Sequence, residues 1–223
     1  MVNKKFKMII ILSGGMDSAI CLALAVKKYG SERVMALTFD YGQRHRMELK
    51  QAKIIAKYFQ VAHSTMKINF FKLIGKSALL NKNIKIKKEK NAPPNTMVTG
   101  RNGIFALIGA MVAHQKGASA ISMGVMGLEA ANSGYPDCSP NYISLIENVI
   151  RLDLQNKRFK IHTPLINLSK KETMGIADKL GVLEFLWKNT ISCYEGLREK
   201  GCEKCPACIL RNAGIKEYLS SLK

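Results

Sequence analysis

The chain has 223 residues, a formal net charge of +19 and an apolar content of 47%. This length allows one large domain, or one domain with a small appendage, and the apolar fraction is sufficient for a sizeable core. The first apolar run, Met8 to Leu12, is too short for a signal peptide or a membrane span, so we expect a cytoplasmic protein that does not bind membranes.

Strand and helix patterns alternate along the chain, which predicts a doubly wound α/β fold with a parallel sheet covered by helices on both faces. Gly30 and Gly117 end two of the helices, and Ser169 with Glu172 forms a capping box at the start of another. The predicted strands are residues 7–12, 33–39, 62–68, 120–125 and 159–162. The predicted helices are residues 17–29, 46–59, 102–117, 141–151 and 169–180, and residues 72–100 are predicted to form an insertion or a loop.

The first strand runs directly into the sequence Ser-Gly-Gly-Met-Asp-Ser at residues 13–18. Two glycines allow a tight turn, and the helix start behind them offers free N–H groups and a positive dipole end to an anion. Asp17 fits such a phosphate site if Mg²⁺ bridges its carboxylate and the phosphates. The segment resembles the pyrophosphate loop of ATP pyrophosphatases and is not a Walker loop, because no G-x-x-x-x-G-K-[ST] occurs in the chain. The alternative is an ordinary strand–turn–helix corner, which needs only one glycine.

Three further polar segments carry candidate binding residues, and those at residues 39–45 and 133–138 are expected near this loop, because ligands of parallel sheets bind beyond the carboxyl ends of the strands. Each has a structural alternative: a polar turn for residues 39–45, a helix start for residues 98–102, and a surface turn for residues 133–138. Arg101 offers bidentate binding of phosphate or carboxylate. Cys138 is an inert packing residue unless its pKa is lowered.

The C-terminal segment contains a cysteine pattern typical of metal binding. Four of the six cysteines form the pattern C-x8-C-x2-C-x2-C, which is Cys193, Cys202, Cys205 and Cys208. Four thiolates at such spacings close a tetrahedral structural Zn²⁺ site. An iron–sulfur cluster is the rival interpretation, and a disulfide pair is less compatible with a reducing cytosol. We therefore divide the chain into a catalytic domain, residues 1–190, and a zinc-binding segment, residues 191–223.

These segments together resemble the 7-cyano-7-deazaguanine synthase family of the queuosine pathway. The resemblance is carried by SGGMDS at 13–18, FDYGQRH at 39–45, GRN at 100–102, SGYPDC at 133–138, TPL at 163–165 and SCYEG with the cysteines at 192–208. It implies a sheet of the adenine nucleotide alpha hydrolase-like (HUP) type and an ATP-dependent C–N ligase. In that family ATP adenylylates 7-carboxy-7-deazaguanine, ammonia displaces AMP to give an amide, and a second activation dehydrates the amide to the nitrile preQ0.

The resemblance assigns roles to individual residues. The expected ligands of ATP and Mg²⁺ are Leu12, Ser13, Gly14, Gly15, Met16, Asp17 and Ser18. The expected substrate contacts are Tyr41, Gln43, Arg44, Arg101, Tyr135 and Asp137. Asp17, Arg44 and Arg101 are the catalytic candidates, with an arginine on the substrate carboxylate and Asp137 on the guanine-like N–H edge.

Two features leave other functions open. The segment 127–132 lacks an expected acidic residue two places before Ser133, and the charge of +19 is high for an enzyme of a small molecule. The alternatives are a defence-type relative that joins a deazaguanine to a protein amine, a tRNA-modifying pyrophosphate-loop enzyme, and a non-catalytic binding module. We expect a homodimer. Basic charge also attracts acidic or protein partners, although the concentrated run at residues 82–90 has no aromatic residues and is more typical of a solvated loop.

Overall fold

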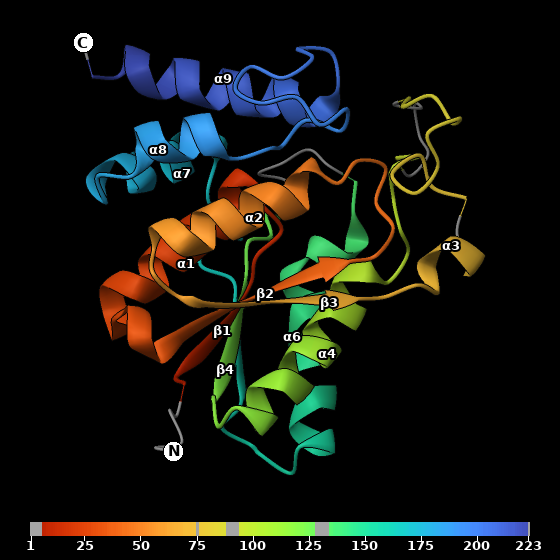
Figure 1. Ribbon diagram of the computed structural model, residues 1–223, viewed down its shortest axis with the longest axis vertical. Helices are drawn as coiled ribbons and strands as arrows, with labels where there is room; N and C mark the ends of the chain where they lie inside the picture. Colours follow the sequence, from red (N-terminus) through yellow and green to blue (C-terminus); the bar gives the residue numbers. More distant parts are fainter. Residues whose placement is uncertain (1–5, 75, 88–93, 128–133, 223) are drawn as a thin grey trace.

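A parallel sheet is the centre of the molecule in the computed structural model, which describes residues 6–74, 76–87, 94–127 and 134–222 (Figure 1). Its strands lie in the order β3-β2-β1-β4-β5, and every neighbouring pair is parallel. The bounds are β1 (Met8–Ile11), β2 (Val34–Asp40), β3 (Ala62–Lys67), β4 (Ala120–Met123) and β5 (Lys160–His162). The predicted α/β fold is confirmed, and each strand starts and ends within about two residues of its predicted range.

Strand β1 lies in the middle because all four of its residues are apolar and buried on both faces of the sheet. Ile9 pairs with Met35 on one side and with Ile121 on the other. The winding of the chain reverses between β1 and β4, and this switch point is where doubly wound sheets bind ligands.

Helices cover both faces of the sheet and bury separate apolar cores against it. One face carries α1 (Met16–Tyr29), α2 (Met47–Tyr58), α7 (Lys170–Lys179) and α8 (Leu183–Asn189). The other face carries α3 (Phe71–Ile74), α4 (Arg101–Gln115) and α6 (Pro140–Asp153). The short 3-10 turns are η1 (Ser31–Arg33) and η2 (Pro136–Cys138). The capping box of Ser169 and Glu172 forms as predicted, and Gly30 ends α1 with a φ of 82°.

The C-terminal helix α9 (Pro206–Ser220) packs across α7 outside the sheet layers (Figure 1). The two helices approach closely at glycines: a Cβ atom on Gly214 would lie 2.6 Å from Lys170 Cβ, and one on Gly175 would lie 3.1 Å from the Tyr218 ring. The sequence patterns do not predict helices α3, α8 or α9. Helix α9 lacks an apolar stripe because its buried positions are Cys208, Arg211 and Gly214. No helix in the described part of the chain is both long and apolar enough to cross a membrane.

Candidate active site

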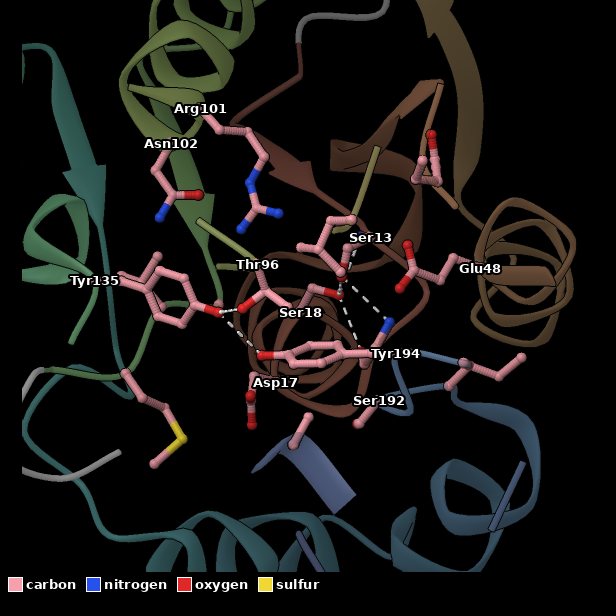
Figure 2. A pocket seen from close by; sticks show the side chains of 18 of the residues that line it. Ser13, Asp17, Ser18, Glu48, Thr96, Arg101, Asn102, Tyr135, Ser192 and Tyr194 are labelled. Carbon is pink, nitrogen blue, oxygen red and sulfur yellow. Dashed lines mark hydrogen bonds between the residues drawn. The ribbon is translucent and has the colours of Figure 1, made fainter. Parts of the chain in front are cut away.

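A cavity of about 340 Å³ opens beyond the carboxyl ends of β1, β2 and β4 (Figure 2). Its wall combines the loop between β1 and α1, the turn after β2, the start of α4, the segment after β4 and the C-terminal segment. Segments far apart in the sequence therefore meet at the switch point, as the order of the strands predicts. Of the predicted site residues, those that line the cavity are Leu12, Ser13, Gly15, Met16, Asp17, Ser18, Tyr41, Gln43, Arg44, Arg101 and Tyr135.

The loop at residues 13–18 is held in shape by its own serines. Ser13 Oγ and Ser18 Oγ lie 3.0 Å apart, and the Gly15 N–H donates to Ser13 Oγ at 3.2 Å. Gly14 has a φ of +87°, and a Cβ atom there would overlap the Glu48 carbonyl oxygen of α2. Only glycine combines this conformation with this approach. Helix α1 begins at Met16 without a side-chain cap, and its first residues, Met16 to Ser18, line the cavity, so the helix start offers an anion site there.

Asp17 has a partner that the sequence analysis does not predict. The ammonium of Lys170, at the first position of α7, forms an ion pair with Asp17 Oδ1. The Lys170 side chain is only 7% exposed and also lies 3.2 Å from Met126 Sδ. A buried ammonium beside the phosphate loop is suited to an anionic ligand as well as to Asp17. No pattern separates this lysine from the other 34 basic residues, because its position depends on the packing of α7 against α1.

Arg101 faces the cavity, and within the described residues its guanidinium donates only to Tyr41. Its Nη1 lies 3.4 Å from Tyr41 Oη, and its guanidinium lies 5.8 Å from the centre of the Tyr41 ring. Burial lowers the pKa of Arg101, but Tyr41, Asp137 and Tyr135 together outweigh burial and raise that pKa above its usual range. Figure 2 shows the guanidinium pointing into the space between Tyr135 and Glu48. Arg101 is therefore placed to bind an anionic group of a ligand.

The polar groups of Arg44 and Gln43 form hydrogen bonds and an ion pair with other parts of the protein. Arg44 donates to the Ile84 carbonyl at 2.9 Å and pairs with Glu195 at 3.1 Å. Gln43 accepts from the Tyr41 N–H at 3.0 Å and donates to the Phe39 carbonyl at 3.3 Å. Both residues line the cavity, but their contacts assign them mainly to the shape of its wall.

Asp137 does not line the cavity, although the sequence analysis places it on the substrate. Its carboxylate accepts from the Asn102 N–H at 3.2 Å, which is the first turn of α4. A carboxylate at a helix N-terminus satisfies a free donor and the helix dipole, and this competes with a contact to a base. Tyr135 does line the cavity, bonded to Thr96 and 3.3 Å from Tyr194 Oη. Burial and the neighbouring Asp137 raise the pKa of Cys138 to about 12, which marks an inert thiol.

Glu48 is a second cavity residue that the sequence analysis misses. It lies in the first turn of α2, and its side chain is 21% exposed. Its nearest basic neighbour is His45, whose Nε2 lies 3.7 Å from Glu48 Oε1 and so beyond hydrogen-bond distance. Burial raises the pKa of Glu48 to about 7, and Arg101 lowers it by a smaller amount. Its place three residues after His45, on the inner side of a helix start, is the signal that could have identified it.

The four predicted zinc ligands come together. All four Sγ atoms of Cys193, Cys202, Cys205 and Cys208 lie within 4.8 Å of one another. The pairs 202–208 and 205–208 are 3.9 and 3.4 Å apart, near the ~3.8 Å edge of a tetrahedron with Zn–S bonds of about 2.3 Å. The Cys205 N–H donates to Cys202 Sγ at 3.3 Å, and the Glu195 N–H donates to Cys193 Sγ at 3.4 Å. This donor set fits a structural Zn²⁺ with no open coordination position.

The cysteine segment is also part of the cavity wall. The Ile191 N–H donates to the Gly14 carbonyl at 3.0 Å, and Ser192 and Tyr194 line the cavity. Arg211 of α9 is 1% exposed, donates to the Trp187 carbonyl at 2.9 Å and lies over the Trp187 ring. The segment that holds the cysteines is thereby fixed to the phosphate loop and to α8.

A phosphate loop at the switch point of a parallel sheet, with buried cations beside it, defines an ATP-using enzyme of the pyrophosphate-loop class. The chain belongs to the family described as queuosine biosynthesis protein QueC, whose model matches residues 7–219. The match includes the phosphate loop, the turn after β2 and all four clustered cysteines.

Two solved structures share the fold at low sequence identity. An NMN synthetase from Francisella tularensis superposes with a TM-score of 0.51 at 16% identity over 88% of this chain and 70% of that chain. A 4-thiouridine synthetase, solved with RNA and bound ATP, gives a TM-score of 0.51 at 17% identity over 97% of this chain and 51% of that chain. At these identities the likeness describes the fold alone.

Proposed function

We propose that this chain uses ATP to activate 7-carboxy-7-deazaguanine and converts it with ammonia, through an adenylate and an amide, to 7-cyano-7-deazaguanine. The observation that carries the proposal is one cavity in which a phosphate loop and the free guanidinium of Arg101 face each other, in a chain of the QueC family. A carboxylate is a poor electrophile, and AMP supplies the leaving group that it lacks.

The phosphate end of the cavity offers N–H groups, hydroxyls and an ammonium that would offset the negative charge of the ATP phosphates. The free N–H groups of α1, the hydroxyls of Ser13 and Ser18 and the ammonium of Lys170 would contact the phosphates. Asp17 suits Mg²⁺, because its carboxylate is 25% exposed and Oδ2 makes no hydrogen bond within the described residues. Bound Mg²⁺ supplies charge neutralisation at the phosphates, and Lys170 keeps the carboxylate oriented toward them.

The substrate end binds the flat base and its carboxylate. Arg101 would hold the carboxylate. The stacked rings of Phe39 and Phe105, with centroids 4.4 Å apart, form an apolar wall for the ring of the base. Tyr135 and Tyr194 place two hydroxyls in the same wall. We propose that these hydroxyls and the Thr96 hydroxyl bond the polar edge of the base, in place of the Asp137 contact expected from the sequence.

The second activation requires the same pocket to accept a neutral amide. Arg101 binds a carboxylate more strongly than an amide, because only the carboxylate carries charge. Replacing Arg101 by Gln should therefore slow activation of the carboxylate more than activation of the amide. Arg151→Gln is the matched control, because Arg151 pairs with Glu147 on α6 and is not part of the cavity lining.

The test is mass spectrometry of reactions started from the carboxylate and, separately, from the amide, each with ATP and ammonium. Nitrile formed from both substrates supports the proposal. Accumulation of the amide, or a deazaguanine attached to a protein amine, would instead identify an amide-forming or conjugating enzyme. Of the segment that raised this alternative, residues 127–132, all but Gly127 lies outside the described residues. Pyrophosphate release that depends on bulk tRNA would favour the tRNA-modifying alternative.

A further inference from the structure

Glu48 is a carboxylate in the cavity wall that has no role in the proposed contacts with ATP and substrate. It lies on α2, directly behind the phosphate loop: its backbone packs against Gly14, and its side chain turns toward the cavity (Figure 2). Within the described residues the carboxylate makes no hydrogen bond, and its one basic neighbour within 4 Å is the His45 ring at 3.7 Å. A largely buried carboxylate without a bonded partner is costly in a structural role, and is suited to exchange protons with a ligand.

The groups around Glu48 leave one direction open. Tyr41 and His45 come from the turn after β2, Arg101 faces it from α4, and the phosphate loop presents the backbone of Gly14. From the C-terminal segment, Gly196 packs on the His45 ring. The open side faces the space between the phosphate loop and Arg101, where an acyl adenylate would place its carbonyl carbon.

Amide formation needs a proton acceptor at this point. Ammonia attacks the acyl carbon, so that a C–N bond forms, the C–O bond to AMP breaks, and AMP leaves with the electron pair. The nitrogen must also lose one proton to become a neutral amide. Lys170 and Arg101 are cationic donors, and Asp17 is paired with Lys170. Of the carboxylates that line the cavity in the described part of the chain, Glu48 is the one that no lysine or arginine side chain pairs with.

We propose that Glu48 is the general base that takes this proton from the attacking nitrogen, a role that rests on the proposed function. The balance is acyl adenylate, ammonia and Glu48 carboxylate on one side, and amide, AMP and protonated Glu48 on the other. Two observations carry the assignment: the carboxylate makes no hydrogen bond to any residue that the structure describes, and it lies between the phosphate loop and the guanidinium proposed to bind the substrate carboxylate. Its pKa of about 7 suits the task, because a base titrating near the working pH transfers protons efficiently in both directions.

The experiment separates adenylation from amide formation. The chain is mixed with ATP and 7-carboxy-7-deazaguanine without ammonium, and the adenylate is quantified in a single turnover. Ammonium is then added at several pH values, with its total concentration adjusted so that free ammonia stays constant. We expect Glu48→Gln to form the adenylate nearly as fast as wild type, and to convert it to the amide about 10²–10⁴-fold more slowly.

The pH profile distinguishes a base from a merely structural residue. The wild-type rate of amide formation should rise through a pKa near 7, Glu48→Gln should lose this rise, and Glu48→Asp should keep it with reduced activity. Glu184→Gln is the control, because it removes an exposed carboxylate on α8. An unchanged pH profile in Glu48→Gln, or equal loss of adenylation and amide formation, would overturn the inference alone. Failure of the wild type to form any adenylate would refute the proposed function, and this inference with it.

Discussion

Replacing Lys170 by methionine tests the ion pair that joins α7 to the phosphate loop. The change keeps the apolar length of the side chain but leaves the Asp17 carboxylate without its cation. Removing one partner of a fully buried pair costs about 3–5 kcal/mol of unfolding free energy. Because the Asp17 side chain is 25% exposed, solvent compensates in part, and we expect about 2 kcal/mol. For a domain of this size this corresponds to a Tm lower by about 4–8 °C.

The assay is thermal unfolding of four proteins without nucleotide: wild type, Lys170→Met, Asp17→Asn and the double variant. Because the double variant removes both charges, it should recover most of the stability that each single variant loses. Pyrophosphate release should be lost in Lys170→Met and should not return in the double variant, since both proteins lack the ammonium beside the phosphates. The reasoning is refuted if the losses of the two single variants simply add in the double variant, because independent sites show no coupling.

Three further outcomes follow from other parts of the structure. The chain should bind one zinc, and Cys205→Ser or a chelator should lower the Tm and abolish pyrophosphate release, because the cysteine segment walls the cavity; metal analysis checks this, and a stoichiometric iron–sulfur absorbance contradicts it. Gly14→Ala should weaken ATP binding measured by calorimetry, because its Cβ would overlap the Glu48 backbone. Glu48→Gln should raise the unfolding free energy at pH 8 by at most about 3 kcal/mol, with no gain near pH 4.5. The sign follows because the folded state, with a pKa of about 7 against 4.5, binds more protons between these values and loses stability as pH rises through them; denaturant titrations at both pH values decide it.

The strands and the five longer helices on the sheet, α1, α2, α4, α6 and α7, could be predicted because each carries its own local signal. The apolar run of β1, the glycines after it and the capping box before α7 act within a few residues of one another. Helix α9 could not be predicted in this way, since its packing depends on Arg211, which is buried by contacts with Trp187 and with the Thr190 carbonyl. An arginine in the middle of a helix has the pattern of an exposed residue until its partners are known.

The same limit applies to the candidate site. The phosphate loop and the four cysteines could be predicted because spacing alone constrains their geometry. The partners of Asp17, Asp137 and Arg44 could not, because each is supplied by a distant element: α7, the start of α4, and the segment around Ile84. These contacts decide whether a side chain remains free for a ligand.

The hydrogen bond from Ile191 to Gly14 joins a segment that is synthesised late to a loop that is synthesised early. Gly14 leaves the ribosome early, whereas Ile191 and the cysteines up to Cys208 emerge late. At about 5–20 residues per second, the phosphate loop exists for roughly 10–35 s without the segment that closes it. A growing chain therefore carries the loop proposed to bind ATP before the C-terminal part of the cavity wall exists. If the four cysteines take up Zn²⁺ as we expect, that uptake would fix the closing segment against the phosphate loop.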